Sequence, residues 1–309
     1  MERRTRSCVD WDWAPLRSLL FAPGNHERKL EKVNSFGSDA IVLDLEDAVA
    51  HDQKDSARRV VKAALPGYSG QAAVLVRVNG AETGRMEDDL RAVVSPNVDG
   101  VMIPKVDRPE VLIGADRLLG ELEDERAVEP GQVRILALIE TALGVARCEE
   151  IACSAPSRVV TLVFGLVDFA NDVGFDLTED ATELLYARSR VVVAARAGRL
   201  RPALDGPYLG LHDSEGLVAD SRRSRQLGFQ GRVVVYPPQV EPVQRAYAEL
   251  DEAAVERNRQ IVEAFEQAEA AGSASIQVGG LFVDYPIFER AKHKLRLFET
   301  LAVHSGQSA

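Results

Sequence analysis

Cysteine is scarce in this sequence, and its placement argues against two ways of stabilising a fold. The three cysteines, Cys8, Cys148 and Cys153, are odd in number, lack the Cys-x-x-Cys spacing and have no histidine clustered beside them. A disulfide framework uses cysteines in pairs, and a structural zinc site needs several cysteine or histidine ligands at short spacing. We therefore interpret the three cysteines as free thiols.

Long apolar runs and net positive charge are also missing. No run approaches the roughly 20 apolar residues that span a membrane, and the N-terminal segment shows no cleavage-site pattern, so we expect a cytoplasmic protein. The formal net charge of −11 disfavours nucleic acids and anionic membranes as partners, because both are bound through basic surfaces. A small anionic substrate stays compatible with it, since such a ligand responds to local charge.

Short runs rich in Val, Ile and Leu recur along the chain, separated by longer, charge-decorated segments. Such nearly continuous apolar runs are typical of parallel strands that are buried on both faces. We count eight, at residues 18–22, 40–45, 74–78, 100–104, 134–139, 159–164, 201–204 and 232–236, of which the seventh is the weakest. The segments between them predict helices at residues 27–36, 54–64, 86–94, 109–121, 142–154, 178–197 and 214–227.

Strict alternation of strand and helix predicts parallel strands joined by right-handed crossovers. Eight repeats favour an α/β fold of the closed (β/α)8 type, the TIM barrel, over an open doubly wound sheet. We expect this barrel to occupy residues 1–241, with a charged connecting helix over 242–271. Residues 272–309 predict a C-terminal lid segment with a turn, a short strand pair and a final helix over 287–303.

Polar residues follow the predicted strands where each one ends. Glu140 closes the fifth strand and Asp168 lies just beyond the sixth, so neighbouring strands would present two carboxylates at the barrel mouth, where active sites of this fold are built. Two carboxylates brought together repel each other unless a cation lies between them. Hard oxygen ligands suit Mg²⁺, with Mn²⁺ as the alternative metal. The competing interpretation is a pair of solvated loop carboxylates.

Arg77 interrupts the third apolar run and needs a partner, because an unpaired buried cation is costly. That partner is either a nearby carboxylate such as Glu46 or Asp47, or the carboxylate or oxyanion of a substrate. The acids of Asp44-Leu-Glu-Asp47 could accordingly point into the barrel mouth or form structural ion pairs with Arg77 or Lys105.

At this point six motifs, in order, resemble the citrate lyase β-subunit-like or acyl-CoA lyase group of the HpcH/HpaI aldolase superfamily. They are Arg17-Ser-Leu-Leu-Phe-Ala-Pro-Gly, Leu43-Asp-Leu-Glu-Asp-Ala-Val, Val76-Arg-Val-Asn, Met102-Ile-Pro-Lys, Ile139-Glu-Thr-Ala and Gly165-Leu-Val-Asp. The resemblance implies a TIM barrel that forms a homotrimer or hexamer. It also implies that Glu140 and Asp168 bind Mg²⁺ and that Arg77 contacts the reacting carbonyl.

Further site residues follow from the resemblance. Arg28 and Lys32, which otherwise look like a charged pair on a solvated helix face, match positions that meet the phosphates of coenzyme A. Glu46 and Asp47, together with Gly165, Leu166 and Val167, are the implied substrate-binding residues.

In the tail, Val283-Asp-Tyr-Pro286 looks like the lid segment of malyl-CoA and citramalyl-CoA lyases. This likeness implies that Asp284 acts as the acid/base in a neighbouring subunit's site; without it, Asp284 would be a turn residue. Two departures put substrate identity in doubt: Val167 stands where relatives commonly have Glu, and Tyr236 where they commonly have His.

The resemblance implies a reversible lyase that splits a carboxylated 3-hydroxyacyl-CoA, of malyl-CoA, citramalyl-CoA or β-methylmalyl-CoA type, into acetyl-CoA or propionyl-CoA and a 2-oxo acid. One alternative is a coenzyme A-independent aldolase for 2-oxo acids that uses a histidine base, for which His26, His51 and His212 are candidates. Another is the β subunit of a citrate lyase complex. The lid argues against a subunit of this kind, which would not need a closing segment of its own.

Overall fold

The computed structural model describes residues 9–12, 14–70, 72–248 and 252–304. The chain forms two compact units, Met1–Tyr247 and Ala248–Ala309. None of the described helices is long and apolar enough to cross a membrane.

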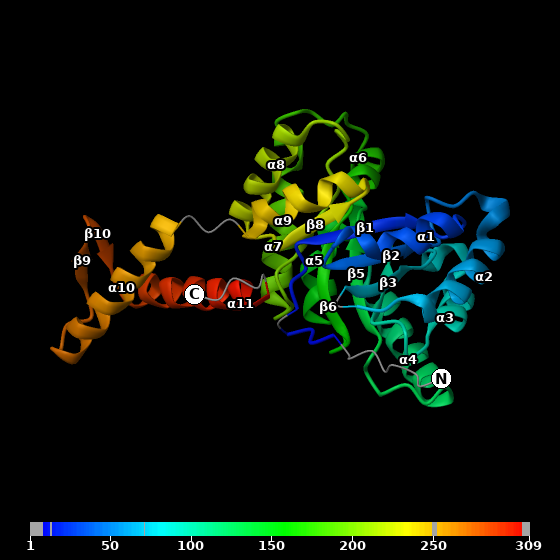
Figure 1. The fold of residues 1–309 in the computed structure, drawn as a ribbon, viewed down its shortest axis with the longest axis horizontal. Helices are drawn as coiled ribbons and strands as arrows, with labels where there is room; N and C mark the ends of the chain where they lie inside the picture. The colour runs from blue at the N-terminus through cyan, green and yellow to red at the C-terminus, as the bar shows by residue number, and fades with distance from the viewer. Residues whose placement is uncertain (1–8, 13, 71, 249–251, 305–309) are drawn as a thin grey trace. The chain divides into compact units, whose positions relative to one another are not determined.

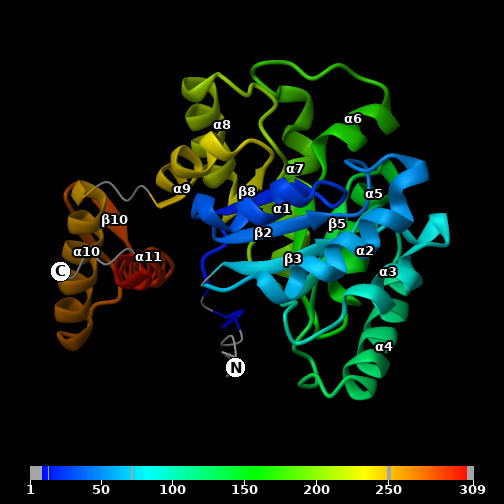
Figure 2. The same ribbon diagram turned by 45° about the vertical axis from the view of Figure 1, so that its right-hand side comes forward.

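The first unit is a closed barrel of eight parallel strands in sequence order. Each strand pairs with the next, and β8 pairs with β1 to close the ring. Figures 1 and 2 show the ring of strands with the helices around it. The strands are β1 (Ser18–Pro23), β2 (Ala40–Asp44), β3 (Ala73–Arg77), β4 (Gly100–Ile103), β5 (Arg134–Ile139), β6 (Val159–Phe164), β7 (Leu204–Asp205) and β8 (Gly231–Val234). The predicted TIM barrel is therefore confirmed.

Helices follow the strands as the sequence predicts, with two differences. They are α1 (Glu27–Val33), α2 (Lys54–Ala64), α3 (Met86–Val93), α4 (Pro109–Glu125), α5 (Ala142–Cys153), α6 (Leu166–Val173), α7 (Leu185–Ala197), α8 (Ser214–Leu227) and α9 (Val240–Ala248). The short helix α6 was not expected, so Asp168 lies in the first turn of a helix. The helix expected from residue 178 begins only at Leu185, after a 3-10 turn at Thr182–Leu184.

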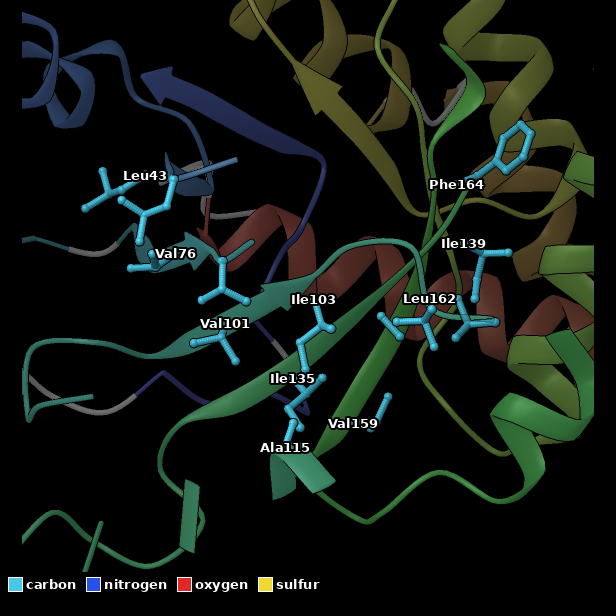
Figure 3. Packing of buried hydrophobic residues seen from close by; sticks show 14 of the residues in the cluster. Leu43, Val76, Val101, Ile103, Ala115, Ile135, Ile139, Val159, Leu162 and Phe164 are labelled. Carbon is cyan, nitrogen blue, oxygen red and sulfur yellow. The ribbon is translucent and has the colours of Figure 1, made fainter. Parts of the chain in front are cut away.

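Strand alternation divides the buried side chains of the barrel into two layers. One layer fills the inside of the ring with residues such as Leu19, Val42, Leu75 and Leu136. The other lies between the strands and the helices. In Figure 3 it contains Leu43, Val76, Val101, Ile103, Ile135, Ile139, Val159, Leu162 and Phe164 together with Ala115 of α4.

The segment before β1 closes the end of the barrel where the strands begin. Trp11 is buried against the inner layer. The guanidinium of Arg201, just before β7, donates to the carbonyl oxygens of Trp11 at 2.6 Å and Ala14 at 2.7 Å, and to Oε1 of Gln230 at 3.0 Å. Arg201 thereby holds the closing segment in place, and the opposite end of the barrel is left for the site.

The second unit contains α10 (Glu252–Ala270), a β-hairpin and α11 (Tyr285–His304). The hairpin pairs β9 (Ile276–Val278) with β10 (Leu281–Val283), as the sequence predicts. Its two-residue turn is Gly279-Gly280, whose φ angles of +55° and +83° favour glycine. Phe265 of α10 stacks on Phe288 of α11 with ring centroids 4.6 Å apart, in a small apolar core of their own.

The single helix expected over residues 242–271 is divided between the two units. α9 packs Val240, Val243 and Tyr247 into the barrel core, and α10 begins at Glu252. Residues 249–251 lie outside the described part of the chain. Because α9 is buried against the barrel, the first compact unit extends to Tyr247 and not to residue 241 as expected.

Replacing Arg201 with Met should destabilise the barrel, because three hydrogen bonds from a charged donor are lost. We expect the free energy of unfolding to fall by about 2 kcal/mol or more, measured by urea denaturation. Arg245→Met is the matched control, because its guanidinium is exposed and, among the described residues, pairs with Glu241 of its own helix. A change below about 0.5 kcal/mol is expected. Equal denaturation midpoints for the two variants would contradict the role of Arg201.

Candidate active site

Side-chain alternation directs three charged residues into the barrel at the carboxyl ends of the strands. In β2, Ala40 and Val42 belong to the inner layer, and the next position of that alternation is Asp44. The same step leads to Arg77 at the end of β3 and to Glu140 directly after β5. These side chains therefore meet at one mouth of the barrel.

Arg77 and Asp44 are register partners on neighbouring strands and form a two-bond ion pair. Nε of Arg77 donates to Oδ1 of Asp44 at 2.7 Å, and Nη2 donates to Oδ2 at 2.6 Å. Nη1 lies 3.1 Å from Oε2 of Glu46. Burial alone would raise the pKa of Asp44, but the charge and hydrogen bonds of Arg77 outweigh it and the pKa is lowered. Among the partners left open by the sequence, Glu46 is observed, and Asp44 is the stronger one.

Glu46 links Arg77 to Lys105. Nζ of Lys105 donates to Oε1 of Glu46 at 2.6 Å, and only 4% of the Glu46 side chain is exposed. Burial raises the pKa of Glu46 even though both cations act to lower it. The backbone of this loop is held as well, because the buried Nζ of Lys54 donates to the carbonyl oxygens of Leu45 at 3.0 Å and Glu46 at 2.6 Å.

Glu140 is almost fully buried, and contacts on two sides set its position. Oε1 accepts a hydrogen bond from the backbone N–H of Lys105 at 2.9 Å. On the other side lies Gly165, where an added Cβ would be 2.5 Å from Cβ of Glu140 and closer still to Oε2. Burial raises the pKa of Glu140 well above its usual range, and the charges of Glu46 and Asp168 raise it further.

The charges at this mouth fit a divalent cation. Four acids, Asp44, Glu46, Glu140 and Asp168, interact there with only two cations, Arg77 and Lys105. Next to this group lie the half-exposed Asp47 and the buried Lys54, one acid and one cation. No group of three or more His, Cys, Asp or Glu side chains that could hold a metal occurs in the described part of the chain. Mg²⁺ suits such a site, because it commonly uses one or two carboxylates and completes its shell with water and substrate oxygens.

The remaining predicted site residues lie in different surroundings. Leu166, the first residue of α6, is buried, and Val167 is half-buried. Asp47 is half-exposed, with Nζ of Lys105 3.9 Å away. Arg28 and Lys32 are exposed on α1. A cavity of about 460 Å³ between α1 and α2 is lined by Glu27, Glu31 and Tyr68 among others, but by neither of these two cations.

The candidate histidines and Tyr236 lie at the surface. His26, His51 and His212 are exposed. The ring of Tyr236 meets that of His212 edge to face, with centroids 5.6 Å apart. No described contact joins these histidines to Glu140 or Arg77.

Asp284 lies in the second unit, directly before α11. Its Oδ1 accepts a bond from the backbone N–H of Ile287 at 3.4 Å, and its carbonyl oxygen accepts from the N–H of Phe288 at 2.9 Å. Asp284 therefore caps the amino-terminal end of α11. This is the structural role that the sequence left open beside the catalytic one.

Asp44 and Lys105 are the two residues of the mouth that our predicted site omitted. The sequence analysis named Lys105 only as a possible member of a structural ion pair, and strand alternation did not separate Asp44 from Glu46. The left-handed backbone of Lys105, with φ of +52°, had no signal in the sequence because this conformation usually indicates glycine.

Gly165→Ala should disturb Glu140, since the new Cβ would overlap its side chain. We expect a loss of stability of about 1–3 kcal/mol and weaker Mn²⁺ binding, measured by denaturation and by paramagnetic resonance of free Mn²⁺. Gly114→Ala in α4 is the control, because an added Cβ there meets nothing within 4 Å. If both variants bind Mn²⁺ equally well, Gly165 does not shape the metal site.

Residues 17–237 match the family model HpcH/HpaI aldolase/citrate lyase. The mitochondrial citramalyl-CoA lyase of Homo sapiens is 32% identical over 296 residues, which cover 92% of this chain and 86% of that protein. The (3S)-malyl-CoA thioesterase of Cereibacter sphaeroides strain KD131 is 35% identical over 289 residues, covering 93% and 96% of the two chains.

Solved structures share the same fold. Protein CitE from Mycobacterium tuberculosis, crystallised in complex with magnesium, acetoacetate and coenzyme A, superposes with a TM-score of 0.74 at 26% identity. The superposition covers 93% of this chain and 99% of CitE.

Proposed function

The chain belongs to the HpcH/HpaI aldolase/citrate lyase family, as its motifs predict, and from that premise we propose that it is a Mg²⁺-dependent carbon–carbon lyase. Its substrate would be a carboxylated 3-hydroxyacyl-CoA of malyl-CoA, citramalyl-CoA or β-methylmalyl-CoA type. The products would be acetyl-CoA or propionyl-CoA and a 2-oxo acid. The observation that carries the proposal is the buried Glu140 beside the charge of Asp168, with Arg77 in the same barrel mouth.

The relatives support both the substrate class and the metal. One relative is named for citramalyl-CoA cleavage, another for hydrolysis of malyl-CoA, and CitE was crystallised with magnesium and coenzyme A. In this chain Glu140 and Asp168 would hold Mg²⁺. A bound divalent cation would act as a Lewis acid toward the oxygens of the 2-oxo acid portion.

Arg77 would stabilise the negative charge that forms on the thioester oxygen. In cleavage, the substrate hydroxyl loses its proton to solvent and becomes the carbonyl of the 2-oxo acid. The bond between the hydroxyl-bearing carbon and the thioester α-carbon breaks, and its electron pair forms the enolate of the acyl-CoA. The guanidinium has five N–H donors and its pair with Asp44 uses two of them, so donors remain for this oxygen. Fixed donors of this kind contribute about 3 kcal/mol to transition-state stabilisation.

Asp284 would deliver the proton that converts the enolate to the acyl-CoA, and in the reverse reaction it would remove that proton. Capping of α11 engages Oδ1, which leaves the second carboxylate oxygen for chemistry. As a member of the second unit, Asp284 would act in the site of a neighbouring subunit of a homotrimer or hexamer. Arg28 and Lys32, exposed on α1, would meet the phosphates of coenzyme A. Glu46, Asp47 and the 165–167 segment would border the substrate.

A coupled assay of the purified protein with malyl-CoA, citramalyl-CoA and β-methylmalyl-CoA should show release of a 2-oxo acid from at least one of them. Release should disappear after chelation and return with Mg²⁺. Free coenzyme A thiol without further acyl-CoA product would identify a thioesterase instead. Inactivity on all three, together with cleavage of free 4-hydroxy-2-oxo acids, would favour the coenzyme A-independent aldolase.

Asp284→Asn should reduce turnover by about 100-fold or more, because the proton donor is lost. Asparagine caps helices as well as aspartate does, so α11 and Mn²⁺ binding should be unaffected. Turnover and metal affinity are measured on the same preparation. Wild-type turnover in this variant would leave Asp284 with its structural role alone.

A further inference from the structure

Lys105 combines a strained backbone with two contacts to the candidate metal site. Its φ of +52° is left-handed, a conformation that costs a non-glycine residue of order 1–3 kcal/mol and persists only where the surrounding structure enforces it. Of the four non-glycine residues with positive φ in the described part of the chain, the others are Ala127, Ala181 and Arg199.

The strained conformation directs the Lys105 N–H toward Glu140. This N–H donates to Oε1 of Glu140 at 2.9 Å, and the next N–H, of Val106, donates to the Leu138 carbonyl at 3.1 Å. Two consecutive N–H groups thus bond to the carboxyl-terminal end of β5 and the residue after it: that of Lys105 to the Glu140 side chain and that of Val106 to the Leu138 backbone. Together with Gly165 on its other side, Lys105 leaves the Glu140 carboxylate little freedom to turn.

The side chain explains why the position holds lysine although glycine would adopt this φ without strain. Nζ donates to Oε1 of Glu46 at 2.6 Å, and 30% of the Lys105 side chain remains exposed at the mouth. One residue therefore contacts two carboxylates, Glu46 and Glu140, that follow the ends of β2 and β5.

We propose that Lys105 is a positioning residue: its left-handed backbone orients Glu140 for the divalent cation, and its ammonium orients Glu46. This inference rests on the metal site of the proposed function and concerns how that site is built. The backbone contribution and the charge contribution can be separated by substitution, because three uncharged residues tolerate a positive φ to different degrees.

The experiment compares Lys105→Met, Lys105→Gly and Lys105→Val by paramagnetic resonance titration with Mn²⁺. All three lose the ammonium, but the β-branched valine resists the left-handed conformation and should move the N–H away from Glu140. Met and Gly should bind Mn²⁺ within about threefold of wild type, while Val should bind about 10- to 100-fold more weakly, the usual cost of losing an outer-shell partner of a metal ligand. With Mg²⁺ at saturation, Lys105→Met should still lose turnover, because Glu46 has lost a partner.

Ala127→Val is the matched control, since Ala127 is exposed, lies at the end of α4 and has a φ of +52° as well. It should lower the melting temperature while leaving Mn²⁺ binding unchanged. Glu140→Gln should abolish binding and so identify the site that is measured.

Three results would overturn the proposal. Equal Mn²⁺ affinity of the Val and Met variants would show that the backbone conformation does not matter. Equal weakening in all three variants would assign the effect to the ammonium alone, and a wild type without Mn²⁺ binding would remove the site itself. A wild type that binds Mn²⁺ but cleaves no acyl-CoA would instead contradict the proposed function and leave the role of Lys105 to be decided by the variants.

Discussion

The ion pair between Arg77 and Asp44 is the interaction on which the rest of the mouth depends. The barrel places a guanidinium at the end of an apolar interior, where an unpaired charge would be costly. Because Asp44 is its register partner on the neighbouring strand β2, Arg77 is paired by two short hydrogen bonds. Removing one partner of such a buried pair typically costs about 3–5 kcal/mol. Glu46 and the ammonium of Lys105 then extend the pair into a chain of charges, and the backbone N–H of Lys105 joins this chain to Glu140.

Glu140 shows how the fold keeps a carboxylate where burial opposes its charge. Its pKa is raised by burial and by neighbouring acids. In the described part of the chain, no salt bridge to Glu140 offsets this effect on its pKa. Glu140 instead accepts a hydrogen bond from the backbone N–H of Lys105 and occupies the space that the missing side chain of Gly165 leaves open. Because the Glu140 carboxylate is held in position but has no cationic partner among the described residues, a bound cation would stabilise its charge. The position of Glu140 therefore requires a strained backbone at Lys105 and a residue without a side chain at position 165.

The sequence was sufficient for the barrel because eight apolar runs and the charges that end them follow from simple periodicities. Those periodicities brought Arg77, Glu46 and Glu140 to one mouth correctly. They did not distinguish Asp44 from its neighbours as the main partner of Arg77, since that choice depends on strand register. The eight-residue helix α6 was missed because short helices carry weak signals. The division of residues 242–271 between two compact units was missed because a charged, alanine-rich sequence predicts helix throughout. Roles for Arg28, Lys32 and Asp284 stay predictions that come from resemblance.

Asp284 caps a helix, and the proposed function also assigns it the role of acid/base. The sequence context offered a turn residue or an acid/base, and the structure shows an N-cap. The two roles are compatible, since a capping carboxylate is held in one orientation by the first turn of its helix, and an acid or base acts best when its position is fixed. The small apolar core of Phe265 and Phe288 supports that turn. The second unit therefore holds the Asp284 carboxylate in a fixed orientation within its own fold.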